Sequence, residues 1–207
     1  MSLRRFRRPV ALIPATLGVL ALAAPAAHAG LLAPTATGCA QEVYEQPFVP
    51  WADRATYVLA PDGGFEAGAS GWELNGAAVS AGNEPFSVHD TGDSAALALA
   101  DGDSATSPVI CVGIDYPTLR LFARNTGASG GALRVDVLFA DALGLTHSLT
   151  VGRVTGHDDW APTAVMPVVA NLLALLPGAR TPIAVRFTAE GGSWLVDDVY
   201  VDPYSKG

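Results

Sequence analysis

WLVDDVYVDP, residues 194–203, alternates like a β-strand but carries two adjacent aspartates at its centre. In a strand of period two, one of these aspartates shares a face with a row of apolar side chains. Strict alternation assigns that face to Leu195, Asp197, Val199 and Val201. A carboxylate there needs a partner, because burial of an unpaired charge is very costly. The available partners are metal ions, backbone N–H groups and basic side chains, and the scarcity of basic residues favours a metal ion.

Similar short apolar runs, separated by glycine, proline, asparagine and aspartate, continue upstream of this stretch. Strand-like segments are predicted at residues 77–80, 85–89, 95–100, 107–112, 118–125, 133–141, 145–154, 183–189 and 194–201. Residues 168–176, VVANLLALL, are rich in leucine and alanine and precede Pro177-Gly178, which favours a short helical segment over a buried strand. The number and spacing of the strands predict an all-β fold, built as a two-sheet antiparallel β-sandwich.

The first 29 residues have the composition of a secretory signal peptide. Four arginines between positions 4 and 8 precede a mostly apolar run over residues 10–26, and Ala27-His28-Ala29 supplies the small residues of a cleavage site. Two prolines interrupt the apolar run, which argues against a transmembrane anchor. We therefore expect a secreted, extracellular protein with no membrane span after cleavage.

The charge of the mature chain would be strongly negative. Without the four leader arginines, eight basic residues stand against twenty acidic ones, a formal charge near −12. Nucleic acids and anionic lipid surfaces require a basic face on the protein. The composition therefore excludes nucleic-acid binding as the expected function.

Cys39 and Cys111 are the only cysteines, and an exported protein with two cysteines usually pairs them. The predicted disulfide would tie an irregular N-terminal segment, residues 30–60, to a single domain over residues 61–207. The alternative is two free buried thiols. Within the N-terminal segment, Trp51 and Tyr57 are expected to be packing residues rather than a binding platform.

The sequence PDGGFEAGASGWELNG, residues 61–76, is expected to form two turns before the next strand. Gly63-Gly64 permits a tight turn with positive φ, because glycine adopts that conformation without steric cost. Phe65 is expected to fill the core, and Glu66 presents a carboxylate next to it.

The start GGFE-x-G-x-x-GW at residues 63–72 and the end W-x-V-DDV-x-V at residues 194–201 resemble the β-jelly-roll carbohydrate-binding modules and their galactose-binding-domain-like relatives. The resemblance implies that the first and last strands lie side by side, with a structural Ca²⁺ ion at their junction. It also implies that Glu66, nearby backbone carbonyls and one of Asp197 and Asp198 bind this ion, and the alternation favours Asp197. Calcium prefers about six to eight oxygen ligands. The alternative is that Glu66 caps a turn and Asp197 accepts backbone N–H bonds.

The polar loop GHDDWAP supplies the best candidate for a ligand site. Trp160 offers a ring for stacking on a sugar, and His157 and Asp158 beside it can hydrogen-bond hydroxyl groups. The alternative is that Trp160 begins a strand and packs against the core.

Catalytic motifs are absent from the sequence. His89, His147 and His157 lie in no GxSxG or HExxH pattern, and paired cysteines leave no thiol nucleophile. We expect that the chain is not an enzyme. A pair of carboxylates for glycoside hydrolysis stays open as the weakest alternative, a small exported hydrolase.

Two functions from different classes follow from these observations. The first is a secreted, non-catalytic jelly-roll domain that binds carbohydrate or another cell-surface ligand and holds a structural calcium. The second is an extracellular structural or adhesive domain for protein–protein interaction, without sugar binding. Exposed coplanar aromatic rings would favour the first, and a contiguous apolar patch would favour the second.

Overall fold

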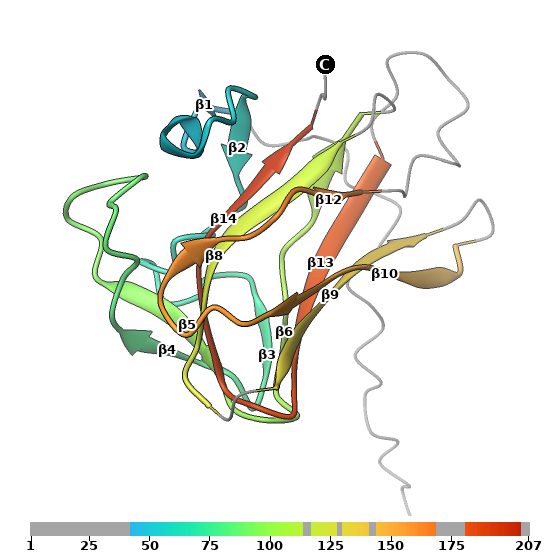
Figure 1. Cartoon of the computed structure of the whole chain (residues 1–207). Coiled ribbons are helices and arrows are strands. Elements are labelled where there is room, and N and C mark those ends of the chain that lie inside the picture. The colour runs from blue at the N-terminus through green and yellow to red at the C-terminus, as the bar shows by residue number, and fades with distance from the viewer. Residues whose placement is uncertain (1–41, 114–116, 128–129, 141–143, 169–180, 204–207) are drawn as a thin grey trace, which may run out of the picture.

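The computed structural model describes residues 42–113, 117–127, 130–140, 144–168 and 181–203 (Figure 1). The expected signal peptide, Cys39 and all but the first residue of the expected helical segment at 168–176 lie outside these ranges. Cys111 lies on a strand and is half-buried. Its disulfide with Cys39 stays a prediction. A search of the described part of the chain finds no helix with the length and apolar character to cross a bilayer.

Two antiparallel sheets pack face to face (Figure 1), which confirms the expected all-β two-sheet sandwich. Sheet A has the order β1 (Tyr44–Glu45), β2 (Tyr57–Leu59), β14 (Trp194–Asp202), β5 (Ala95–Leu99), β4 (Ala78–Ala81). On its other side β14 pairs with β8 (Thr118–Asn125), which also pairs with β11 (Ala161–Pro162) and β12 (Met166–Pro167). Sheet B has the order β10 (Thr146–Thr155), β9 (Ala132–Ala140), β13 (Thr181–Glu190), β6 (Ser104–Thr106), β3 (Glu73–Asn75), and β7 (Ile110–Val112) pairs with β13. One 3-10 turn, η1 (Val49–Trp51), is the helical element of the described residues.

The main core lies between the two sheets and is built from alternate residues of their strands. In β9 it takes Leu133, Val135 and Val137, which are fully buried, as the alternation of this segment predicts. The expected plug from the first turn is confirmed: Phe65 is fully buried and packs against Trp72, with ring centroids 5.1 Å apart. Removal of these apolar surfaces from water stabilises the sandwich.

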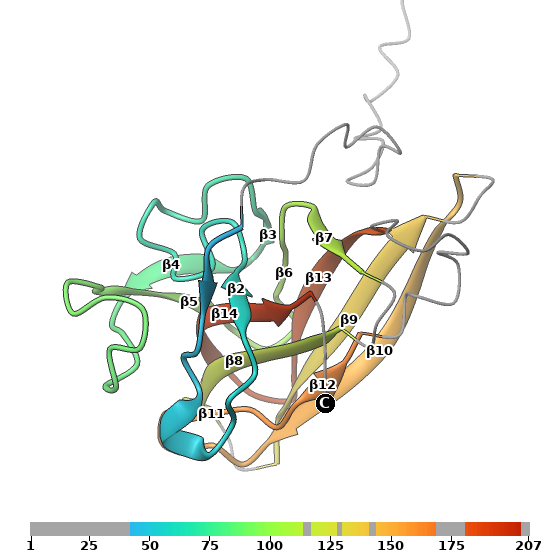
Figure 2. The same cartoon turned by 90° about the horizontal axis from the view of Figure 1, so that it is seen from above.

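A second apolar cluster lies on the outer face of sheet A. The N-terminal strap, residues 44–59, runs beside β14 and β8 (Figure 2) and contributes Phe48 and Tyr57 to this cluster. The Phe48 ring stacks on Phe122 at 5.5 Å, and the guanidinium of Arg120 lies 4.2 Å from the Phe48 ring centroid. The strap is therefore packed as part of the domain, and the expectation that Tyr57 is a packing residue is confirmed.

The strict alternation assumed for the last strand is wrong. The pairing of β14 with β8 shifts register between Asp197 and Tyr200, which is a β-bulge, and Asp198 has a φ of 46°. The bulge inserts one extra residue, so Val196 and Val199 both point into the main core, while Tyr200 joins the outer cluster. Both aspartates of the bulge are buried as a result.

The strand expected at residues 85–89 is also wrong, since these residues belong to a loop between β4 and β5. The carboxylate of Glu84 accepts hydrogen bonds from the backbone N–H groups of Phe86 and Val88, at 2.5 and 2.8 Å. Ser87 between them has a φ of 51°. Side-chain bonds of this kind compete with strand pairing and bend the chain into a loop.

Candidate metal centre and ligand cleft

The first and last strands of the domain meet, as the resemblance implies. Ala60 donates to the carbonyl oxygen of Val199 at 2.8 Å, and Val199 donates to that of Gly63 at 3.1 Å. These bonds continue the pairing of β2 with β14 into the following turn. The turn therefore lies against the bulge that carries the two aspartates.

Neither Gly63 nor Gly64 has a positive φ, so the expected conformation of this turn is wrong. These glycines instead let the backbone of the turn lie close to β14. Positive φ occurs instead at Asp62 and Phe65, at 49° and 62°. A Cβ atom on Gly63 would lie 2.9 Å from the carbonyl oxygen of Val199. A Cβ atom on Gly64 would lie 3.2 Å from Asp198 Oδ1, so this glycine leaves room beside the carboxylate.

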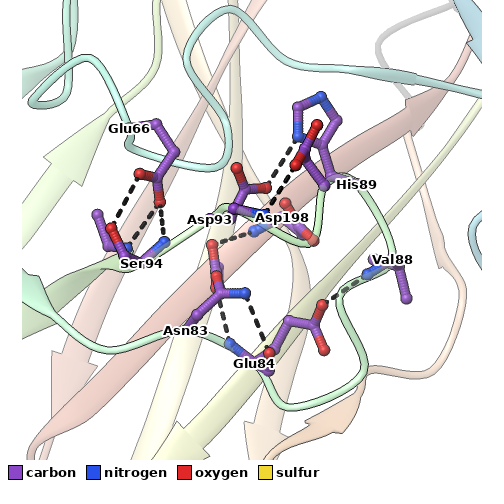
Figure 3. Close-up of polar contacts among 12 residues, drawn as sticks. Glu66, Asn83, Glu84, Val88, His89, Asp93, Ser94 and Asp198 are labelled. Atoms are coloured by element: carbon purple, nitrogen blue, oxygen red, sulfur yellow. Dashed lines mark hydrogen bonds and ion pairs between the residues drawn. The ribbon is translucent and has the colours of Figure 1, made fainter.

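Glu66 has a different partner from the one the resemblance implies. Its Oε1 accepts hydrogen bonds from the backbone N–H groups of Ser94 and Ala95, both at 2.7 Å (Figure 3). β5 begins at the second of these two residues. The alternative that Glu66 caps a turn therefore describes its contacts, and its role as a metal ligand stays a prediction without support from this geometry.

Replacement of Glu66 separates these two roles. We expect Glu66→Ala to lower the free energy of unfolding by about 1–2 kcal/mol, because two N–H groups lose their acceptor. Glu66→Gln keeps an acceptor oxygen and should lose less. Urea denaturation of both variants measures this. Loss of a metal-induced rise in melting temperature in Glu66→Gln would show instead that this carboxylate binds the ion.

Asp197 is buried and hydrogen-bonded to the backbone. Its Oδ2 accepts from the N–H of Glu84 at 3.0 Å, and its Oδ1 accepts from the N–H of Asp198 at 2.9 Å. Burial, followed by the charge of Asp198, raises the pKa of Asp197 to about 8. This aspartate therefore anchors the loop that contains Glu84, as the alternative from the sequence proposes.

Asp198 is the aspartate whose carboxylate has no hydrogen-bond partner among the described residues. The residue is fully buried, and neither Oδ1 nor Oδ2 has a hydrogen-bond partner within the described ranges. Burial, followed by the charge of Glu84, raises the pKa of Asp198 to about 7. An unpaired carboxylate this deep calls for a cationic partner.

His89 and Asp93 approach Asp198 from the loop between β4 and β5 (Figure 3). One ligand atom from each of the three residues lies within 4.8 Å of the others, and His89 Nδ1 lies 2.9 Å from Asp93 Oδ2. Burial lowers the pKa of His89, but the hydrogen bond and charge of Asp93 raise it above its ordinary value. We call these three residues the Asp198 cluster.

The donors of the Asp198 cluster differ from those expected for calcium. The cluster offers two carboxylates and one imidazole nitrogen, while Glu66 and Asp197 are occupied by backbone N–H groups. A calcium site would need further oxygen ligands from water or backbone. Sequence reasoning missed His89 and Asp93, because HDTGD reads as an ordinary polar turn and only the fold brings it to the bulge.

A cleft of about 550 Å³ opens where the N-terminal strap meets β8, β14 and the segment that precedes β12. Its lining residues include two aromatic, two acidic and two basic ones: Trp51, Tyr57, Asp53, Asp202, Arg54 and Arg120. The volume lies within the range of about 300–1,000 Å³ that is typical of small-molecule sites. Trp51 thus packs against Phe122, as expected of a packing residue, and also lines a cleft, which the sequence did not indicate.

Hydrogen bonds fix the charged groups of this cleft. Asp53 accepts from Tyr57 Oη at 2.8 Å and from Arg120 Nη1 at 2.7 Å through Oδ2, and from the N–H of Ala55 through Oδ1. Burial raises the pKa of Asp53, but these hydrogen bonds lower it below its usual range. The pKa of Asp202, by contrast, is raised to about 6 by burial and by the charge of Asp53.

The residues expected to bind a ligand in the polar loop do not converge. Trp160 is half-buried and packs against the outer aromatic cluster, as its alternative proposes. His157 lines a separate pocket of about 320 Å³ with Thr155 and Thr163, and Asp158 is exposed. Trp160 is not among the residues of that pocket.

Comparisons with known proteins find similarity at the level of structure. No family model matches the sequence, and no curated protein matches it. Carbohydrate-binding modules are among the solved structures that this chain resembles. The CBM22-1–GH10 modules of Clostridium thermocellum Xyn10B, solved with xylohexaose, match at 15% identity over 69% of this chain and 28% of that chain, with a TM-score of 0.47.

Two other matches span nearly the whole length of the solved structure that is matched. TmCBM61, solved with β-1,4-galactotriose, matches at 20% identity over 69% of this chain and 96% of that chain, with a TM-score of 0.42. A family 16 carbohydrate-binding module-2 matches at 22% identity over 69% of this chain and 98% of that chain, with a TM-score of 0.46. None of these likenesses is close enough to carry a ligand or an activity to this chain.

Proposed function

We propose that this chain is a secreted, non-catalytic β-sandwich domain that binds a neutral carbohydrate in the cleft between the N-terminal strap and sheet A. The observation that carries the proposal is the lining of this cleft, where the Trp51 ring lies with Asp53, Arg120 and Asp202. A divalent cation at the Asp198 cluster would stabilise the junction of the first and last strands. Calcium is the ion that the family resemblance implies.

The chemistry of the lining fits a polyhydroxylated ligand. A sugar ring presents an apolar face, which an indole can cover, and hydroxyl groups that both donate and accept hydrogen bonds. Arg120 donates a hydrogen bond from Nε to the carbonyl oxygen of Thr163 and another from Nη1 to Asp53. We assign its Nη2 as the hydrogen-bond donor to the ligand. The lining residues include two acidic and two basic ones, with Asp53 paired to Arg120, a charge balance that favours an uncharged ligand.

Binding without catalysis follows from the contacts of Asp53. Three hydrogen bonds occupy its two oxygens, and one donor is the permanently charged Arg120. A carboxylate held in this way is a poor nucleophile and a poor base, since its lone pairs are already engaged. The contacts of Asp53 therefore favour recognition over glycoside hydrolysis.

Titration with oligosaccharides tests this function. Xylohexaose and β-1,4-galactotriose are suitable first probes within a broader panel of neutral glycans, with isothermal calorimetry as the readout. We expect Trp51→Ala to weaken binding at least about tenfold, a loss of roughly 1.4 kcal/mol, because the stacking surface is removed. Arg54→Ala, at the exposed rim of the cleft, should weaken binding without a change in stability.

Tyr44→Ala is the matched control, because Tyr44 is an exposed aromatic residue that does not line the cleft. Its binding constant should equal that of the parent. The carbohydrate proposal fails if no glycan binds, or if Tyr44→Ala weakens binding as much as Arg54→Ala does. Release of reducing sugar during the titration would show hydrolysis and would overturn the non-catalytic assignment.

An interaction with protein is favoured by one other observation. Strand β10 is ten residues long and pairs only with β9 among the described residues. Leu149, within this strand, is 39% exposed. Unpaired strand edges with apolar side chains are templates for pairing with another chain. Concentration-dependent sedimentation, abolished by Leu149→Lys, would support this second candidate.

A further inference from the structure

We propose that the Asp198 cluster is a site for a divalent ion of the zinc type, held by His89 Nδ1 and by carboxylate oxygens of Asp93 and Asp198. The inference rests on the cation site proposed above, and it assigns zinc to that site in place of calcium. A three-ligand site of this kind leaves one coordination position for water or for an external group.

The need for a cation comes from Asp198. Its carboxylate is fully buried, and neither oxygen is hydrogen-bonded within the described part of the chain. Asp197 beside it is also buried, and Glu84 adds a third carboxylate whose charge acts on Asp198. No lysine or arginine forms an ion pair with any of these three carboxylates in the described residues. Protonated His89 can supply one positive charge here through its ion pair with Asp93, and a divalent ion would balance the remaining carboxylates.

The identity of the ion follows from the donors that are free to bind it. Glu66 and Asp197 already accept backbone N–H groups, so part of the oxygen set that the resemblance implies for calcium is engaged elsewhere. What reaches Asp198 is one more carboxylate and an imidazole. Imidazole nitrogen suits zinc, copper and nickel, whereas calcium and magnesium prefer oxygen.

The spacing of the donors is near that of a zinc site and would have to adjust around the ion. Ligands about 2.0–2.1 Å from a tetrahedral ion lie about 3.3 Å from one another. In the Asp198 cluster the ligand atoms lie within 4.8 Å of one another, and the His89–Asp93 pair is at 2.9 Å. The ion would separate this pair slightly and draw Asp198 toward it.

The loop holds its two ligands in place before any ion binds. Glu84 ties the start of the loop to Asp197, and the N–H of Gly82 donates to the carbonyl oxygen of Ser94 at 2.9 Å, which closes its end. His89 is exposed, so the fourth position of the ion faces solvent, while Asp198 lies at the base of the site. Gly64 leaves space next to Asp198 Oδ1, which any side chain would reduce.

Metal titration of the purified protein tests the inference. After treatment with a chelator and dialysis, zinc and calcium chloride are added separately, with isothermal calorimetry and thermal unfolding as readouts. We expect one zinc ion to bind per chain and to raise the melting temperature, because the ion binds only the folded state. Calcium should give a smaller shift at the same concentration.

Two variants and one control assign the ligands. His89→Gln and Asp198→Asn should each weaken zinc binding at least tenfold. His157→Gln, which alters a histidine outside the cluster, should leave it unchanged. A rise in melting temperature with calcium alone, or zinc affinity that survives His89→Gln, overturns the zinc assignment and leaves the proposed cation site standing. If neither ion binds, the zinc assignment and the proposed cation site are both wrong. The carbohydrate function is tested separately by the sugar titration.

Discussion

Without metal, the Asp198→Asn protein is expected to be more stable than the parent at about pH 8, by as much as roughly 4 kcal/mol. The pKa of Asp198 rises to about 7 in the folded protein because its carboxylate is buried. The folded state therefore binds a proton more tightly than the unfolded chain does, and stability falls as the pH rises from about 4 to about 7. Asparagine keeps the size of the side chain and removes the charge, so the variant escapes most of this loss.

Urea denaturation in the presence of a chelator measures the difference. The advantage of Asp198→Asn should shrink to between about 1 and 2 kcal/mol at pH 5, where the parent carboxyl is protonated in the folded state. Asp158→Asn is the control, because Asp158 is exposed, and it should match the parent at both pH values. A variant less stable than its parent at about pH 8 would mean that Asp198 has a partner without metal. With zinc added, the order of stability should reverse.

Phe48→Ala is expected to lower the free energy of unfolding by about 3–5 kcal/mol, the range for removal of a buried phenylalanine ring. Phe48 is fully buried, although it belongs to the N-terminal strap. Its ring contacts Tyr57 at 4.9 Å and Phe122 at 5.5 Å between centroids, and Arg120 covers it. Loss of the ring leaves a cavity and removes the surface that holds the strap on sheet A.

Chemical denaturation of Phe48→Ala, compared with Val49→Ala, tests this expectation. Val49 is the next residue but is 44% exposed, so its truncation should cost less than about 1 kcal/mol. Since the strap forms one wall of the ligand cleft, Phe48→Ala should also weaken sugar binding. Equal stability of the two variants would show that the strap is not part of the cooperative fold.

Much of the sandwich could be predicted from sequence, because burial imposes a local period. Strands β8, β9, β13 and β14 lie within one or two residues of the segments expected from alternation of apolar side chains. The burial of Phe65 and the contact of the first strands with β14 also follow from the sequence or its resemblance to a family. Such features depend on residues that are neighbours in the sequence, or on the recognisable motifs at residues 63–72 and 194–201.

The short strands and the strap were missed for the same physical reason. β1, β11 and β12 contain two residues each, too few for any periodicity to show. Phe48 lies in a stretch without alternation and is buried only because sheet A presents Phe122 and Tyr200 to it. Burial that comes from a distant partner leaves no local pattern.

Local patterns along the chain were enough to predict the all-β sandwich and to draw attention to the paired aspartates. Which of the two carboxylates lacks a hydrogen-bond partner among the described residues depends on the folded arrangement, because a bulge at Asp197 and Asp198 breaks the alternation of a regular strand. The groups that surround these aspartates also depend on the folded arrangement. Glu66 turns to the start of β5, while His89 and Asp93 reach Asp198 from a loop about a hundred residues earlier in the chain. Ligand sets are made by contacts between distant segments, and such contacts are fixed by packing rather than by the local order of residues.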